Sequence, residues 1–455
     1  MSDIQSYDVV VVGGGPAGST IGALLAKSGH QVLILERERF PRYHIGESLV
    51  TGMTPLLNEL GLVEELDRRF QHKTGISLRW GSDPQPWRSD FSSASSVYSH
   101  AWHVTRSEFD ELMLDNARSF GATVVEEAHV TEVTGADTDR VTGVVYTHGG
   151  KQHQVNSRYV VDASGQARTV ARRMTRTQWQ EDLRNVAVWS YFDTYTPIEN
   201  EQDILVEAID GGGWMWGIPL SKDKLSLGYV LSAEKLTEAL KEGKSQRDVF
   251  LEGLDASNLA KAMVDPDDTP AEMSTARDWS HLSDAFYGPG WVSVGDSAAF
   301  IDPLFSSGIW LGTSGAWLAA RALDSALKNP GAEEHALGRF EAVYRQLFKD
   351  VLLYVRFFMD PSRLREEYME RAREVTQMYT ESSRVGFVSL ISGIGAVADL
   401  VDFDPMGMDG LRDIMMERHQ AAQAQAQAEQ APEEGAAGAE VPQEQPQSAD
   451  AVAAV

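Results

Sequence analysis

The sequence predicts an α/β protein with an N-terminal strand–turn–helix–strand unit, a strand-rich middle and a helical C-terminal region. Three observations predict this fold class. A glycine-rich turn separates two apolar strands near the start, strand patterns fill much of residues 186–229, and apolar residues follow helical spacing after about residue 335. The chain has 455 residues, 42% of them hydrophobic and 24% charged, which is the composition of a soluble globular protein.

The first unit occupies residues 8–36. Val9–Val12 has the continuous apolar character of a strand buried on both faces. Pro16–Ser28 carries apolar residues at helical spacing, and Gly29 follows as a typical helix end. Gln31–Glu36 is a second buried strand. This order predicts a βαβ unit with the glycine turn at the end of its first strand.

The composition changes near the end of the chain, and further helices and strands are expected before that point. The segment 419–455 is rich in Ala, Gln and Glu and has no aromatic residue, so it is expected to be a disordered tail. The expected elements are a helix at Glu108–Phe120, strands at Thr123–Val133, Val141–Thr147, Tyr159–Gly165, Val186–Asp193, within Asp203–Tyr229 and at Trp291–Gly295, a helix at Gly312–Leu327, and later helices interrupted at Pro361 and Gly386.

Charge and composition exclude several classes of function. The net charge of -27 argues against binding to nucleic acid or to an anionic membrane surface. No apolar run reaches the length of a spanning helix, and Met1–Tyr7 lacks the features of a signal peptide, so we expect a cytoplasmic protein. Cys is absent, which excludes disulfides, thiol nucleophiles and Cys-type zinc sites, and no metal site is predicted.

The glycine turn predicts a dinucleotide cofactor. Gly13 permits the tight turn after the strand, Gly15 lets the backbone approach a pyrophosphate, and Gly18 lets the helix pack close to the sheet. The helix that begins at Pro16 and Ala17 presents free N–H groups to the anion. Glu36 ends the second strand, where a carboxylate suits the hydroxyls of an adenosine ribose.

A late segment resembles FAD-dependent monooxygenase-type proteins. Gly295-Asp296, after a buried strand, is similar to the Gly-Asp segment whose Asp meets the ribityl chain of FAD in such proteins. The resemblance implies FAD rather than NAD, and a Rossmann-like parallel sheet split between distant segments. The implied organisation is an FAD-binding domain at 1–185 plus 280–330, a β-sheet substrate region at 186–279, and a helical region at 331–418. Ser48, Arg42 and Arg106 are candidate cofactor contacts, although solvated surface positions explain either arginine equally well.

Three other features each have a simple structural explanation. Trp214, Trp216 and Ile218, followed by Pro219, would share one face of a strand, as residues that pack in a core often do. Lys73 taken alone would be a solvated charge. The turn at Ser307 and Gly308 exposes backbone N–H groups that could bind a small anion, or it is only the start of a helix.

Taken together, these features resemble the flavin-dependent halogenases. The W-x-W-x-I-P block is that family's distinguishing motif, and Arg39–Leu49 is similar to its N-terminal segment. The resemblance covers about residues 8–315. It implies that Lys73 is essential, that a halide binds the backbone amides of Ser307 and Gly308, and that the tryptophan block separates substrate from flavin and so suppresses hydroxylation.

The resemblance also implies a reaction and its partners. A flavin reductase supplies FADH2, which with O2 forms a flavin hydroperoxide, and chloride or bromide then yields hypohalous acid. Lys73 would hydrogen-bond this acid, or form a haloamine, and direct it to one carbon of an aromatic substrate. A confined apolar site would tune the pKa of the lysine and exclude water.

One departure from the family pattern concerns the substrate. Tryptophan halogenases carry a glutamate where this chain has Phe305. Its absence argues against free tryptophan and favours a phenol or pyrrole, either free or tethered to an acyl or peptidyl carrier protein. His72 and His44 are possible bases.

Two other hypotheses remain open from the sequence. A flavin monooxygenase or prenyl-chain reductase of the same superfamily needs the glycine turn, Glu36 and Asp296, but neither Lys73 nor the tryptophan block. A non-catalytic flavin-binding partner in a biosynthetic complex would need only the cofactor residues.

Overall fold

A parallel sheet joins strands from distant parts of the chain. The computed structural model describes residues 5–83, 85–265, 267–268, 270, 272–376 and 382–407; the predicted tail at 419–455 lies outside these residues. The parallel strands follow the order β17-β10-β1-β2-β7, and Val160–Asp162 of β10 pair with β17 from about 130 residues later. The predicted split sheet is therefore confirmed. Its strands are β1 (Gln5–Val12), β2 (Val32–Leu35), β7 (Thr123–Val125), β10 (Lys151–Asp162) and β17 (Trp291–Ser293), with β16 (Tyr287–Gly288), β8 (His129–Thr134) and β9 (Gly143–His148) added in antiparallel pairs.

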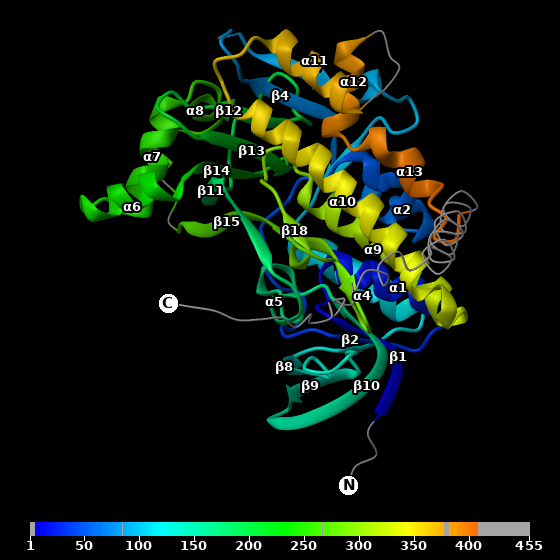
Figure 1. Ribbon diagram of the computed structural model, residues 1–455. Helices are drawn as coiled ribbons and strands as arrows, with labels where there is room; N and C mark the ends of the chain where they lie inside the picture. Colours follow the sequence, from blue (N-terminus) through cyan, green and yellow to red (C-terminus); the bar gives the residue numbers. More distant parts are fainter. Residues whose placement is uncertain are drawn as a thin grey trace, which may run out of the picture. The chain divides into compact units, whose positions relative to one another are not determined.

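Helices pack on one face of this sheet, and a β-hairpin packs on the other. Helix α1 (Pro16–Lys27) packs on the face of Val32 and Ile34, where a Cβ at Gly22 would lie 2.5 Å from Ile34 Cδ1. Helices α4 (Arg106–Ser119) and α9 (Gly308–Lys328) pack against α1 on the same side (Figure 1). The opposite face, with Val10 and Leu33, shares a core with the β8–β9 hairpin. The valine run of β1 is buried on both faces, as its composition predicts.

A second, mainly antiparallel sheet forms the middle of the chain. Its strand order is β18-β15-β11-β14-β13-β12-β4-β5, with a parallel pair between β12 and β4. Strands β4 and β5 come from before residue 185, so this sheet draws on both sides of the predicted boundary at 186. The strands are β4 (Gly75–Arg79), β5 (Trp87–Asp90), β11 (Thr177–Phe192), β12 (Ile204–Ala208), β13 (Trp214–Ser221), β14 (Lys224–Ser232), β15 (Ser274–Ser283) and β18 (Ala299–Phe300).

Three helices that the sequence analysis did not predict cover one face of the second sheet. They are α6 (Ala233–Lys241), α7 (Gln246–Ala256) and α8 (Leu259–Met263). Met215 and Leu227 share a core with Phe250 and Met263 on this side. Because neighbouring residues of a strand point to opposite faces, Trp214 and Trp216 lie on the other face. A short separate ribbon pairs β3 (Gln71–Lys73) with β6 (Ala101–His103).

The C-terminal part is helical, as predicted. Pro361 lies between α10 and α11, but the prediction that Gly386 interrupts a helix is wrong, because Gly386 lies within α12. A Cβ there would come within 2.8 Å of Arg373 Cα, so this glycine lets α12 pack closely on α11. The helices are α10 (Glu333–Phe358), α11 (Arg365–Thr376), α12 (Ser383–Ile391) and α13 (Val397–Val401); the remaining helical segments are α2 (Thr54–Glu59), α3 (Val63–Arg69), α5 (Ala171–Met174) and the 3-10 turns Thr51–Met53, Phe91–Ser93, Gly165–Ala167, Gly295–Ser297, Pro330–Ala332 and Ile394–Ala396.

Within the described residues, no single helix is both long and apolar enough to cross a membrane. The bent pair Ser383–Ile391 and Ile394–Val401 meets the length and composition requirement only when its two helices are taken together.

Candidate active site

The glycine turn between β1 and α1 is shaped by close backbone contacts. Gly13 has φ +105°, and a Cβ there would lie 2.4 Å from the carbonyl oxygen of Ala163. A Cβ at Gly18 would lie 1.9 Å from the carbonyl oxygen of Gly13. Gly15 has an ordinary extended backbone, with φ -68° and ψ -177°, and caps the N-terminus of α1. Gly13 and Gly18 are therefore required by the backbone itself, whereas Gly15 leaves open space at a helix N-terminus.

The carboxylate of Glu36 is held beside this turn. Its Oε2 accepts the Gly14 N–H at 2.7 Å, its Oε1 accepts the Glu38 N–H at 2.8 Å, and the side chain is buried. Each carboxylate oxygen can accept a further hydrogen bond. Glu36 thus lies beside the glycine turn with capacity for further hydrogen bonds, and its contact with a ribose stays a prediction.

Two arginines meet one buried carboxylate next to the turn. Arg42 Nη1 lies 3.1 Å from Asp110 Oδ2, and Arg106 donates to both oxygens of Asp110 at 2.8 and 2.9 Å. A Cβ at Gly15 would lie 3.3 Å from Arg42 Nη2, so the guanidinium of Arg42 lies over the open side of the turn. Arg106 also donates to the carbonyl oxygen of Ile45 and is buried. Arg42 therefore lies beside the glycine turn, and Arg106 holds the neighbouring segment through Ile45.

Asp296 lies where α1 and α9 approach each other. Gly295, with φ +65°, donates its N–H to the hydroxyl of Tyr344 at 3.1 Å and lies close to Ala17. Burial raises the pKa of Asp296 to about 6, and the positive charge of Arg106 opposes that shift. The charge of Arg106 therefore acts on Asp296. The glycine turn, the acidic residues and the arginines near it are of the types that fit a bound dinucleotide flavin.

Lys73 is fully buried at the end of β3. Its Nζ donates to the carbonyl oxygen of Leu49 at 3.0 Å and lies 5.5 Å from the ring centre of Phe91. Burial lowers the pKa of Lys73 to about 7, and the buried carboxylate of Asp203 opposes the shift. That carboxylate is already paired with Arg88. Near neutral pH the lysine thus exists both as an ammonium and as a free amine, a state that a solvated lysine does not reach.

The two histidines considered as bases lie differently from Lys73. His72 precedes Lys73 on β3 and points to the opposite, partly exposed side, where its Nε2 lies 2.9 Å from Asp67 Oδ1. His44 has an exposed side chain, and its Nδ1 lies 2.7 Å from the carbonyl oxygen of Ile45. The structure therefore brings neither imidazole into contact with the lysine amine.

The tryptophan block lies on the face of the second sheet that α6–α8 leave free. The rings of Trp214 and Trp216 are buried with their centres 6.1 Å apart, and Trp189 of β11 extends the row at 6.2 Å from Trp216. Trp216 Nε1 donates to Ser226 Oγ at 3.2 Å. A Cβ at Gly228 would lie 2.2 Å from the Trp216 ring, so this glycine makes room for it. Ile218 and Pro219 continue the block in the buried part of β13, which packs against both β3 and β6.

Residues 42–50 contact the arginine pair near the glycine turn, the tryptophan face and Lys73. From the tryptophan face, Trp189 Nε1 donates to the Tyr43 hydroxyl at 2.7 Å and the Tyr191 hydroxyl donates to Glu47 Oε1 at 2.7 Å. Leu49 receives the hydrogen bond of the lysine amine, and the next residues, Thr51–Met53, contact α9. One segment of the chain thus contacts residues of all three candidate groups.

Two buried titratable residues in this region were missed from the sequence. Glu47 has no hydrogen-bond partner at Oε2 among the described residues, and burial raises its pKa. Burial lowers the pKa of His103 to about 3, and the nearby charge of Lys73 acts in the same direction, so His103 is neutral. Ser48 is also buried, and its backbone bridges to His103. The sequence signal for Glu47 is its place in Arg39–Leu49, the segment that resembles the halogenase N-terminal segment.

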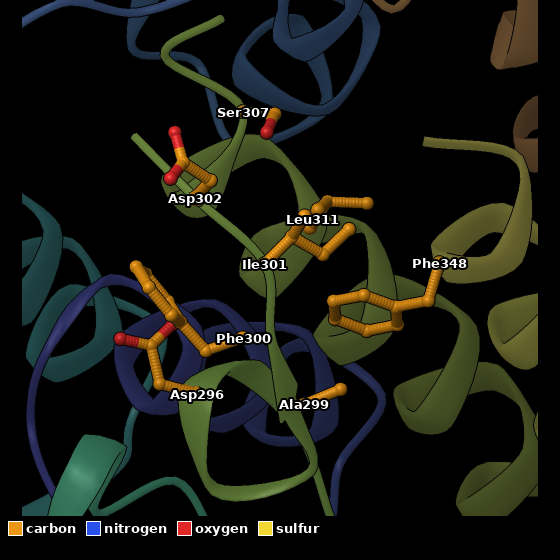
Figure 2. Close-up of a pocket in the computed structure, with 9 residues that line it drawn as sticks. Asp296, Ala299, Phe300, Ile301, Asp302, Ser307, Leu311 and Phe348 are labelled. Carbon is orange, nitrogen blue, oxygen red and sulfur yellow. The ribbon is translucent and has the colours of Figure 1, made fainter. Parts of the chain in front are cut away.

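A small pocket lies at the N-terminus of α9. Asp296, Phe300, Asp302 and Ser307 line it together with Leu311 and Phe348, as Figure 2 shows. Ser307 is the N-cap of α9 and Gly308 its first residue, so the unpaired N–H groups of the first helical turn lie at this pocket. Ser306, with φ +57°, makes the turn into the helix. The structure therefore places the predicted halide-binding amides and the cofactor residue Asp296 around one space.

Phe305 points away from that pocket into a cluster of aromatic rings. Its ring centre lies 4.9 Å from Phe358 and 5.6 Å from Tyr354, both on α10, and it is buried. A carboxylate at this position would be surrounded by rings without an ionic partner. The local packing therefore suits an apolar side chain at 305.

Comparison with known proteins decides the family. The family model described as tryptophan halogenase matches residues 8–98 and 88–389 of the chain. The chain belongs to the flavin-dependent halogenases. It is 33% identical over 409 residues to the tryptophan 2-halogenase of Chondromyces crocatus, covering 87% of this chain and 77% of that protein. Two solved structures are also similar. The myxobacterial chondrochloren halogenase CndH is 31% identical, with a TM-score of 0.74, and the match covers 90% of this chain and 99% of that one. The flavin-dependent brominase Bmp2 is 25% identical, with a TM-score of 0.73, and the match covers 92% of this chain and 100% of that one.

Family membership decides the general function. This halogenase is an oxidoreductase that uses FAD and O2, and such enzymes generally need a separate flavin reductase. The halogenase hypothesis is thereby favoured over the monooxygenase, prenyl-chain reductase and non-catalytic alternatives.

The pocket at α9 leads to a prediction for Gly308. A Cβ at this position has nothing within 4 Å, so a side chain would extend into open space while the backbone N–H stays in place. We expect Gly308→Val to raise the KM for halide by about tenfold, because the added methyl groups crowd an anion at the amides, and to leave FAD affinity unchanged. Steady-state rates against halide concentration measure this, with Gly331→Val on the surface as the matched control. An unchanged halide KM would argue against an anion site at Gly308.

Proposed function

We propose that this halogenase chlorinates an electron-rich aromatic such as a phenol or a pyrrole, free or attached to an acyl or peptidyl carrier protein. The observation that carries the proposal is the buried amine of Lys73, with its lowered pKa, on a ribbon against which the tryptophan strand packs. Bromide is the alternative halide, since the similar protein Bmp2 is a brominase.

Each residue of the cofactor site would contact a particular part of FAD. Gly13, Gly15, Pro16, Ala17 and Gly18 form the turn for the pyrophosphate. Reduced FAD with O2 would supply the oxidant that converts halide to hypohalous acid. The remaining contacts would be Glu36 to the ribose, Arg42 to the pyrophosphate, and Gly295 and Asp296 to the ribityl chain. Ser48 and Arg106, in or next to residues 44–50, would be further contacts with the cofactor.

The residues of the chain would then direct the halogen. The N–H groups of Ser307 and Gly308 would hold the halide at the N-terminus of α9. The ammonium of Lys73 would donate a hydrogen bond to hypohalous acid; alternatively, its free amine would take the halogen to form a haloamine and release water. Both forms of the lysine are accessible near pH 7, because burial has lowered its pKa. The tryptophan block would separate substrate from flavin and so suppress hydroxylation.

Phe305 supports a phenol or pyrrole over an indole. The relative from Chondromyces crocatus is named a tryptophan 2-halogenase, so free tryptophan is the competing substrate. At position 305 this chain has a buried phenyl ring among other rings rather than a carboxylate able to stabilise an indole intermediate. A phenol needs less help, because its own oxygen stabilises the cation formed on attack.

A reaction with defined components tests the proposal. The protein is incubated with FAD, a flavin reductase, NADH, chloride or bromide, and a panel of phenols, pyrroles, carrier-bound aromatics and free tryptophan. The expected product of a phenol or pyrrole carries the isotope pattern of the added halogen. Only hydroxylated products, independent of halide, would contradict halogenation, and exclusive halogenation of tryptophan would contradict the proposed substrate class.

A further inference from the structure

A cluster of two histidines and one aspartate lies on the opposite side of β3 from Lys73. Asp67 comes from α3, His72 from β3, and His100 immediately precedes β6. His72 Nε2 and His100 Nε2 lie 2.9 and 3.3 Å from the same oxygen, Oδ1 of Asp67. One potential ligand atom from each of the three side chains lies within 4.8 Å of the other two. Three separate segments therefore converge on a single point.

The geometry suits a tetrahedral metal ion. Zinc binds imidazole nitrogen and carboxylate oxygen at about 2.0–2.1 Å, which places two tetrahedral ligand atoms roughly 3.3 Å apart. The two nitrogen–oxygen distances in the cluster already lie near this value. Both Nε2 atoms face the same oxygen, Asp67 Oδ1. The imidazole rings are stacked, with centres 4.2 Å apart and an angle of 25° between them, so they would rotate apart for both nitrogens to point at one ion.

The surroundings of the cluster have two further features of a metal site. Trp102 Nε1 donates to Asp67 Oδ1 at 2.9 Å, and a hydrogen bond of this kind orients a ligating carboxylate. The three side chains are between 33% and 41% exposed, which leaves a path for an ion and room for a water as fourth ligand. The strongly negative chain, with net charge -27, attracts cations to its surface.

We propose that Asp67, His72 and His100 form a binding site for a divalent transition-metal ion of the zinc class. The ion would join α3, β3 and the start of β6, and so stabilise the ribbon whose other side carries Lys73 and His103. Because Lys73 points away from the cluster, the site would serve stability and not the halogenation chemistry. It is independent of the function proposed above.

Titration of the FAD-loaded, untagged full-length protein with Zn2+ after treatment with a chelator tests the proposal. Calorimetry is expected to show one site with a dissociation constant in the low micromolar range or below. The variants His72→Ala/His100→Ala and Asp67→Asn are expected to bind at least about tenfold more weakly, since each removes ligands. His129→Ala removes an exposed histidine from β8 and is expected to bind as the wild type does.

Two further measurements separate a specific site from a surface association. Co2+ bound at a tetrahedral site of this kind should show visible ligand-field absorption that the double histidine variant lacks. Zn2+ should raise the melting temperature of the wild type and of His129→Ala, but not that of the double variant. A dissociation constant weaker than about 0.1 mM, or equal Zn2+ binding by wild type and double variant, would overturn the proposal.

Discussion

Replacement of Lys73 by Met should lower the rate of halogenation by about a thousandfold or more, because the buried amine that we propose to direct the halogen would be lost. Met matches the length and shape of the lysine stem, so the buried space between Leu49 and Phe91 stays filled. FAD affinity should change by less than about twofold, since Lys73 makes none of the contacts at the glycine turn. Product formation by mass spectrometry and FAD titration by fluorescence measure the two quantities.

A matched surface variant controls for the loss of a positive charge. Lys151→Met removes a lysine from the exposed start of β10 and should halogenate at the wild-type rate. A Lys73→Met variant that halogenates within about tenfold of the wild type would refute the role assigned to this lysine.

The same variant makes a prediction about stability and pH. The pKa of Lys73 is about 7 in the folded protein, whereas an unfolded lysine titrates near 10.5, so the unfolded chain binds more protons between these values. The lysine therefore reduces the free energy of unfolding most below pH 7, by up to about 5 kcal/mol, and this cost disappears as the pH rises toward 10.5. Lys73→Met should be more stable than the wild type at pH 6, with a difference that shrinks toward pH 10. Urea unfolding across this range measures it, and a difference independent of pH would contradict the buried-amine account.

Gly15→Val should weaken FAD binding by about a hundredfold or more without unfolding the protein. The backbone of Gly15 adopts φ -68° and ψ -177°, which any residue can adopt, and a Cβ would meet only the end of the flexible Arg42 side chain at 3.3 Å. The valine methyl groups would occupy the space in front of the α1 N-terminus, where a pyrophosphate has to approach the backbone. Loss of bound flavin on gel filtration, at an unchanged circular dichroism spectrum, is the expected result.

The neighbouring glycine provides the contrast that makes this prediction specific. Gly13→Val should fail to fold, because Gly13 has φ +105° and a Cβ added there would lie 2.4 Å from the Ala163 carbonyl oxygen. Gly331→Val, in a surface turn, should bind FAD as the wild type does. If Gly15→Val retains tight FAD binding, the pyrophosphate does not lie on this turn.

The sequence by itself determined the local features that depend on neighbouring residues. The valine run of β1, the glycines of the turn and the acidic end of β2 lie within 30 residues, and their spacing specifies a βαβ unit without reference to the rest of the chain. The resemblance carried by the tryptophan block and Gly295-Asp296 extended this to the split sheet and to the family. Pro361 ended a helix as expected, because proline lacks an N–H wherever it occurs.

Only the tertiary structure decided what depends on contacts between distant segments. Gly386 was expected to break a helix, but its missing side chain instead lets α12 approach Arg373 of α11. Strands β4 and β5 joined the second sheet across a boundary that composition did not reveal. The pKa of Lys73 depends on its burial and on the charge of Asp203, which is 130 residues away in the sequence. The pKa values of Glu47 and His103 likewise depend on residues distant in the sequence, such as Tyr191 and Lys73. Desolvation is a property of the packed surroundings, so the sequence can identify Lys73 as a candidate, but only the fold lowers the pKa of its amine.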